Sequence, residues 1–417
     1  HPGGPAMDAC LAEKTTFAFR AAALAQDAEM KAANRIADNI AYEDGAHLTV
    51  FNPQAHERGG VVIAPFNDWA PIGLPMMYRT PANEHGEKWL SSGWCIDRQV
   101  QYPPEWLMTK PFKLIDTQTG EAVPHQVRIT TDPQAANAHA AERVAMRDPM
   151  MRHDLVFAPT GVPSVGHKTY TVVELETHQP VKTHAIGLTV DNDFLTLRVD
   201  EATGDIASYF DKELGCELVD ASAPHRMTQL FVRSAKTSQD MPGGRIDSVT
   251  VVDDGPVFTT IRVRGGMVGV PMWTKEITIY HTFKRVDVAV RLLKDSTPII
   301  EGFMAFPFAI EAPQFRFEGG GSVVEPTVDQ LPGTNTDTYA IQHWANVYNE
   351  QGGVMLTPLD APMLEFGGIY PGYVSGAHHG ETWPEYGHEF LAPNSLTTGH
   401  MYSMLFYNNY YTNFVNV

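Results

Sequence analysis

Alternating apolar and polar positions dominate most of the chain. In the stretch 192–220 every second residue from Leu195 to Val199 is apolar, and turn sequences containing Gly204 and Gly215 follow. Such alternation is typical of strands with one buried face, and glycine tolerates the positive φ that tight turns need. The stretch therefore predicts three short antiparallel strands. Their buried face requires a second layer of structure to cover it.

The same period of two recurs along the chain. Residues 274–283 and 285–293 alternate strongly and predict an antiparallel sheet with one solvated face. Shorter apolar segments at 47–66, 111–129 and 154–175 are interrupted by Pro and Gly at the spacing of a β-sandwich.

The N-terminal region has a different pattern. Residues 6–41 are rich in Ala and contain neither Pro nor Gly, which predicts one long helix or two consecutive helices that end at 43–45. Residues 133–148 resemble an inserted helix, and residues 64–104, rich in Trp, Pro and Gly, predict a long irregular excursion.

These patterns predict a mainly β protein in three parts. A helical segment spans 1–45, a small β-sandwich with insertions spans 46–185, and a large antiparallel β region spans 186–417. At 417 residues the chain exceeds the roughly 250 to 300 residues at which single cores stop growing, so several domains are expected.

Composition narrows the function classes. A formal charge of -19 argues against binding to nucleic acid or to an anionic membrane. The three cysteines are far apart, which fits a reducing compartment better than a disulfide framework. The apolar run 303–310 is far shorter than the ~20 residues of a membrane span, and no signal-peptide pattern opens the chain. We therefore expect a soluble, cytoplasmic protein.

Candidate chemistry is confined to loops. The usual signatures of serine hydrolases, zinc proteases and nucleotide enzymes are absent, and the Gly-rich segment 317–326 predicts a turn. The segment 378–388 is dense in His and Glu and suits either a metal or a polar, sugar-contacting loop, in which Trp383 would stack on a sugar or pack inward. Asp360 would point into a cleft or cap a turn. Composition alone does not decide whether the loop at 65–75 or the loop at 233–244 is the better candidate for a site.

Several segments, in matching order and spacing, carry a resemblance to a known family. Together they resemble the middle and C-terminal regions of family-38 glycoside hydrolases, the α-mannosidases and their bacterial relatives. The segments are "LTVFNPQAHERGGVV" (48–62), "NDFLTLRVDEATGDIASYFDKELGCELVD" (192–220), "DGPVFTTIRVRG" (254–265), "IQHWANVYNEQGGVMLTPLDAPMLEFGG" (341–368) and "YNNYYTNF" (407–414).

The resemblance implies a helical-bundle segment, a small β-sandwich and a large mutarotase-like supersandwich that is C-terminally incomplete here. It also implies a retaining mechanism with two carboxylates and a zinc ion that holds sugar hydroxyls. In the family the nucleophilic Asp and most zinc ligands lie on an N-terminal barrel of the same polypeptide. We therefore expect the catalytic carboxylates, which this sequence leaves unknown, outside this chain.

Particular residues follow from the same resemblance. "HPGG" at 1–4 is similar to the "HTWG" motif of many bacterial relatives, which makes His1 a candidate zinc ligand, although Pro2 and Gly3 depart from the motif. The relatives send a loop of the supersandwich toward the barrel mouth, which makes Arg233 and Asp240 candidates for substrate contacts, together with Asp360 and Trp383.

Two alternatives stay open. In the first alternative, the chain is a stand-alone carbohydrate-binding or structural β module. In the second, it is a mutarotase-like or lyase-like enzyme that uses its own sandwich cleft. The last of these needs His and Tyr or carboxylates that converge on one sheet. Homo-oligomerisation also stays open.

Overall fold

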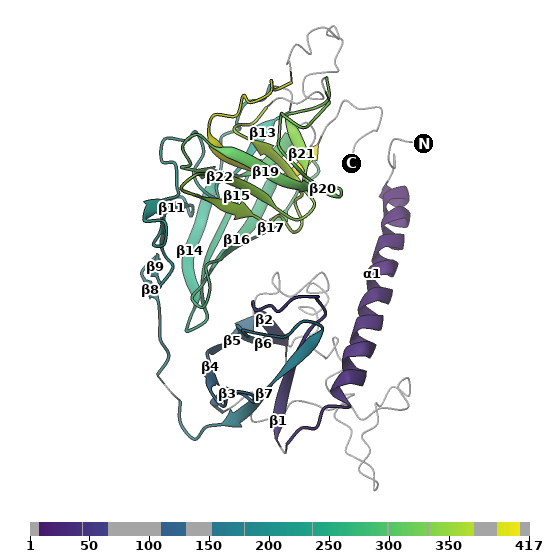
Figure 1. Ribbon diagram of the computed structural model, residues 1–417. Coiled ribbons are helices and arrows are strands. Elements are labelled where there is room, and N and C mark those ends of the chain that lie inside the picture. Colours follow the sequence, from purple (N-terminus) through teal and green to yellow (C-terminus); the bar gives the residue numbers. More distant parts are fainter. Residues whose placement is uncertain are drawn as a thin grey trace. The chain divides into compact units, whose positions relative to one another are not determined.

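A computed structural model describes residues 8–43, 45–65, 110–130, 152–178, 180–235, 237–297, 300–331, 333–370 and 390–408. In these ranges the chain is mainly β, with several antiparallel sheets and one N-terminal helix, as predicted (Figure 1). The helix predicted at 133–148 and nearly all of the excursion at 64–104 lie outside the described residues. The β structure divides into a smaller compact unit, made of the strands before Thr183 and of residues Gly255–Phe258, and a larger one made of the rest of the chain from His184 onward.

The N-terminal helix α1 spans Asp8–Ala37, close to the range predicted from the Ala-rich composition. Its large apolar side chains are exposed, including Phe17, Phe19 and Leu24. The helix ends before the sequence at 43–45, which contains the turn-forming Gly45 at φ 132°.

The smaller unit is a sandwich of two antiparallel sheets (Figure 1). Its core lies between them, where Leu114 and Tyr170 of one sheet meet Leu155 and Phe157 of the other. One sheet has the order β1 (Ala46–Asn52), β7 (Gly166–Glu174), β3 (Phe112–Asp116), β4 (Ala122–Val123), and the other has the order β2 (Val62–Pro65), β6 (Arg152–Phe157), β5 (His125–Thr130).

The described part of the larger unit forms four antiparallel sheets. The predicted three-strand stretch forms β10 (Leu195–Val199), β11 (Ile206–Asp211) and β12 (Cys216–Glu217), and the two strongly alternating segments form the paired strands β16 (Val270–Tyr280) and β17 (Val286–Leu293). The first sheet has the order β12 (Cys216–Glu217), β11 (Ile206–Asp211), β10 (Leu195–Val199), β9 (Thr189–Asp191), β8 (Ala185–Ile186), and the second has the order β14 (Arg245–Asp254), β15 (Phe258–Met267), β16 (Val270–Tyr280), β17 (Val286–Leu293). The third sheet has the order β20 (Ser322–Val324), β19 (Gln314–Gly319), β22 (Ala345–Asn349), β23 (Gly352–Leu356). The fourth sheet has the order β13 (Leu230–Ser234), β18 (Ile300–Phe308), β25 (Gly399–Asn408), β24 (Met363–Phe366), β21 (Thr338–Ala340).

One continuous core joins these sheets. Leu197 of β10, Ile277 of β16, Phe306 of β18 and Phe317 of β19 are all buried in it. Burying such a side chain contributes about 1.5 to 3 kcal/mol, so this core is the main stabilising feature of the unit. The Gly-rich segment predicted as a turn connects β19 to β20, with Gly321 at φ 92°.

Candidate functional site

The sheet that contains β13, β18, β25 and β24 carries different residues on its two faces. On β18, Met304 and Phe306 belong to the main core, whereas Phe303 and Ala305 face the opposite side together with Tyr402 of β25. This opposite face is the one that holds charged side chains. Strand register places Arg233 beside Glu301 on neighbouring strands, and Glu365 beside Tyr402.

Asp240 lies at the solvent edge of this face, where the His225 ring and the Arg233 guanidinium hold its carboxylate. His225 Nε2 lies 2.8 Å from Asp240 Oδ2, and Arg233 Nε lies 3.5 Å from Asp240 Oδ1. A backbone bridge also pairs Arg233 with Asp240, and Arg233 Nη2 donates to the carbonyl of Ser238. The loop between the two residues is therefore closed by both backbone and side-chain contacts.

His225 continues the contacts into the protein. Its Nδ1 lies 3.4 Å from the Tyr402 hydroxyl, and its ring stacks on Phe231 with centroids 4.0 Å apart. Burial lowers the pKa of His225 below its usual value, and the neighbouring Asp240 carboxylate acts in the opposite direction. Burial also raises the pKa of Tyr402 to about 12, so the phenol stays protonated near neutral pH.

Arg233 and Glu301 leave two polar atoms without hydrogen bonds. Arg233 Nη1 lies 3.8 Å from Glu301 Oε1, and both atoms are buried with no hydrogen-bond partner among the described residues. The separation is too long for a direct hydrogen bond. One oxygen atom about 2.9 Å from each would accept from the guanidinium and donate to the carboxylate, and a hydroxyl group or a water can do both.

Two buried glutamates lie on this face. Burial raises the pKa of Glu301 to about 7, with Arg233 opposing the shift and Asp240 adding to it. Burial raises the pKa of Glu365 to about 8, and the charge of Glu301 adds to this shift. The backbone N–H of Tyr370 opposes the shift, because it donates a hydrogen bond of 2.7 Å to Glu365 Oε2. Near neutral pH Glu365 is therefore mostly protonated, whereas Glu301, beside Arg233, titrates in this range.

The structure brings together some of the predicted residues. Arg233 and Asp240 are in contact, whereas Asp360 is exposed in the bend between β23 and β24 and has no hydrogen bond to this cluster within the described ranges. Trp383 and His1 lie outside the described residues. The substrate and zinc roles of these five residues remain predictions.

The sequence analysis missed His225, Glu301, Glu365 and Tyr402. One signal was available: Glu301 and Glu365 each lie in an otherwise apolar strand sequence, "IEGFMAFPF" and "MLEF". A carboxylate among buried apolar residues is rare unless it is paired or has a function.

Neither a metal group nor a membrane helix is found in the parts that the structure describes. No three His, Cys, Asp or Glu residues there lie close enough to hold a metal ion. No described helix is long and apolar enough to cross a membrane.

Comparisons with known proteins complete the picture. Residues 190–359 match the family model described as glycosyl hydrolases family 38 C-terminal domain. The solved structure of an alpha-mannosidase from Enterococcus faecalis V583 has 12% sequence identity and a TM-score of 0.50, and the match covers 90% of this chain and 45% of that chain. The chain thus spans less than half the length of that protein, and at this identity the likeness concerns the fold. No curated protein matches the chain.

Proposed function

We propose that this chain, which carries a glycosyl hydrolases family 38 C-terminal domain, is the non-barrel portion of a retaining α-mannosidase-like glycoside hydrolase. The observation that carries the proposal is the family match over 190–359, a range that includes the strands and the loop bearing Arg233, Asp240 and Glu301. The partner of this portion would be an N-terminal catalytic barrel of the same polypeptide.

The geometry of the described carboxylates agrees with catalytic acids that lie elsewhere. A retaining glycosidase needs two carboxyl groups about 5 Å apart that face the same sugar ring. Glu301 and Glu365 are each only 2% exposed, so neither faces a site that solvent fills. We assign to the barrel both the nucleophile and the acid–base residue.

Asp240 is the group of this cluster suited to a sugar hydroxyl. Its side chain is 51% exposed, and His225 and Arg233 fix its orientation. A carboxylate has about four lone-pair directions, so it can accept from a hydroxyl while it keeps both contacts. Arg233 would act mainly by holding Asp240, and Asp360 and Trp383 would add contacts at the rim of the site.

Zinc belongs to the proposal for the complete enzyme, where it would hold sugar hydroxyls during ring distortion. The described residues do not form a zinc site, because no suitable group of three ligands occurs among them. His1 is the one ligand that we propose for this chain. No step of the mechanism is assigned to the metal here.

The test compares two polypeptides, the 417-residue chain and the full gene product, with an aryl α-mannoside as substrate. We expect turnover by the full product alone, and loss of activity on chelation. Asp240→Asn in the full product should lower kcat/KM about tenfold or more, since a hydrogen bond to a charged group contributes about 1.5 to 3 kcal/mol. Asp287→Asn is the matched control, because Asp287 is also paired with an arginine but lies outside the cluster. Turnover by the 417-residue chain, or an inactive full product, would contradict the proposal.

One observation favours a second candidate, acid–base chemistry on the sheet face itself. Asp240, His225 and Tyr402 form a continuous chain of contacts on one face, as a mutarotase-like or lyase-like site would need. Polarimetry of freshly dissolved α-D-mannose with the 417-residue chain tests this directly. This candidate is excluded if the wild-type chain anomerises the sugar no faster than buffer or the His225→Ala variant does.

A further inference from the structure

A pocket with a volume of about 360 Å³ opens in the larger unit, beside the loop that follows Asp240. Its walls come from the turn around Thr203, the segment from Arg226 to Val232, residues 241–246, and the strand residues Gly266, Met267 and Trp273. The lining is mixed. Apolar side chains include Leu230, Phe231, Val232, Met241, Ile246, Met267 and Trp273, and the polar ones are Thr203, Asp205, Arg226, Gln229 and Arg245.

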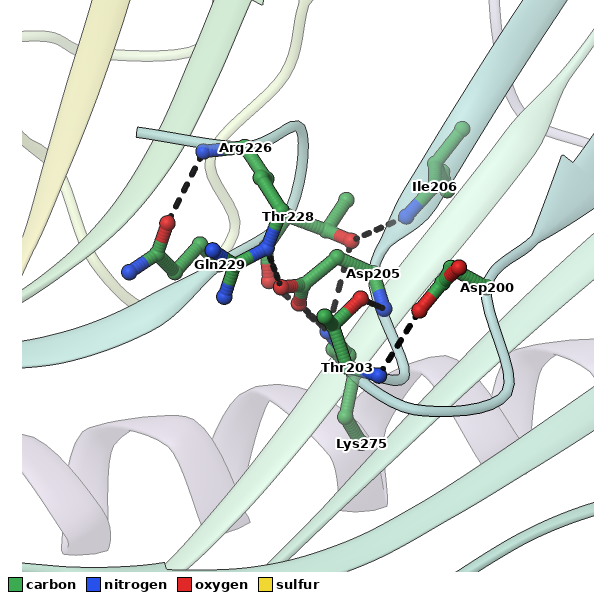
Figure 2. A network of polar contacts seen from close by, with 8 residues as sticks. All are labelled: Asp200, Thr203, Asp205, Ile206, Arg226, Thr228, Gln229 and Lys275. Atoms are coloured by element: carbon green, nitrogen blue, oxygen red, sulfur yellow. Dashed lines mark hydrogen bonds and ion pairs between the residues drawn. The ribbon is translucent and has the colours of Figure 1, made fainter. Parts of the chain in front are cut away.

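The wall of the pocket includes a network of charges, shown in Figure 2, in which Asp205 and Lys275 are buried and the Arg226 side chain is 55% exposed. Asp205 Oδ1 lies 2.7 Å from Lys275 Nζ, and Asp205 Oδ2 lies 2.9 Å from Arg226 Nε. Lys275 is fully buried and also donates to the carbonyl of Thr228 at 2.8 Å. One carboxylate thus meets two cationic groups, and both of its oxygens are already engaged.

Arg226 retains free donors on the pocket side of this network. Its Nε is bound to Asp205, and Nη1 and Nη2 have no acceptor among the described residues. Gln229 Oε1 accepts from the backbone N–H of Arg226 at 2.9 Å, which leaves the amide nitrogen of Gln229 without a described acceptor (Figure 2). Arg245 differs, because Asp247 and the carbonyl of Pro271 hold its guanidinium.

The pocket therefore presents unused donors and no unused carboxylate. The excess of cations over carboxylates stands out in a chain with a net charge of -19. A volume of this size falls within the range of small-molecule sites, which combine a mostly apolar lining with a few fixed polar groups. An arginine whose Nη atoms are free matches the planar fork of a carboxylate or the oxygens of a phosphate.

We propose that this pocket binds a small ring-bearing ligand with one anionic group, a carboxylate or a phosphate. The anion is held by Arg226 Nη1 and Nη2 with the Gln229 amide beside it, and the ring lies against Met241 and Trp273. Asp205, which Lys275 holds through its other oxygen, fixes Arg226 Nε. The same excess of donors disfavours cationic ligands.

The test measures binding to the 417-residue chain by isothermal titration calorimetry with three probes. Glucuronate supplies a carboxylate, glucose 6-phosphate supplies a phosphate, and glucose is the neutral control. We expect saturable binding of at least one of the two anions, at least tenfold tighter than glucose. The anion that binds distinguishes the carboxylate from the phosphate.

Variants locate the site. Arg226→Gln should weaken anion binding at least tenfold, and Arg285→Gln, which alters another partly exposed arginine paired with a carboxylate, should leave it unchanged. Ala202→Phe fills the mouth of the pocket from an exposed lining position without touching the polar network, and it should also abolish binding. No saturable binding of either anion, equal binding of glucose, or binding that survives Arg226→Gln or Ala202→Phe would overturn the proposal.

Discussion

Glu365→Gln should remove a large part of the pH dependence of stability. Burial raises the pKa of Glu365 to about 8 from an ordinary value of 4.5, so the folded state keeps a proton that the unfolded state releases. A raised carboxyl pKa contributes stability that is fully present below the unfolded pKa and is lost as pH rises through the folded pKa. From pH 4.5 to pH 7 the free energy of unfolding therefore falls by about 3 kcal/mol, because one pKa unit corresponds to about 1.4 kcal/mol.

The neutral amide removes this titration and keeps an acceptor for the Tyr370 N–H. Urea unfolding of wild type and Glu365→Gln, followed by tryptophan fluorescence from pH 5 to pH 8, measures the difference in the free energy of unfolding. We expect the variant to gain about 3 kcal/mol relative to wild type across this range. Glu217→Gln is the matched control, since Glu217 accepts a backbone N–H at 2.7 Å but is exposed. Parallel pH profiles for wild type and Glu365→Gln would refute the reasoning.

Two further substitutions test the larger unit by urea unfolding. Asp205→Asn leaves the Lys275 ammonium buried without its carboxylate, and burial lowers the pKa of Lys275 whereas Asp205 opposes that shift. The variant should therefore lower the free energy of unfolding by about 3 to 5 kcal/mol. A loss below about 1 kcal/mol would contradict this. Gly204→Ala places a Cβ 2.3 Å from Val263 Cγ1 at φ 67°, and should cost about 1 to 3 kcal/mol more than Gly120→Ala, where φ is 74° and nothing lies within 4 Å. Equal costs for the two glycines would show that the contact with Val263 is relieved.

The strands that the sequence predicted best are those with one solvated face. β16 and β17 alternate in sequence, and their register pairs Ile277 with Val288 as two apolar residues on one face. The turn after β10 was also predictable, because Gly204 adopts the positive φ that the turn sequence suggested. In both cases the determining interactions are local or between neighbouring strands.

β18 shows why the charged face was not predictable. All nine residues from Ile300 to Phe308 are buried, so the strand has no alternation to indicate which residues share a face. Glu301 meets Arg233 only because β13 and β18 pair in one register, across 68 positions of sequence (301 − 233). Local patterns do not encode such pairings, so the loop around Arg233 and Asp240 was predicted without its buried partners.

Burial decides between the two functional candidates for this face. An acid–base group must reach its substrate, and of the charged residues in the cluster Asp240 is the one that is half exposed, whereas Arg233, Glu301 and Glu365 are at most 7% exposed. Burial raises the pKa of Glu365 to about 8, with the charge of Glu301 adding to the shift, and burial raises the pKa of Glu301 to about 7, but neither buried carboxyl can reach a substrate. The face therefore fits a rigid support that presents Asp240 better than a catalytic cleft of its own. That argument favours catalytic acids supplied by another part of the polypeptide.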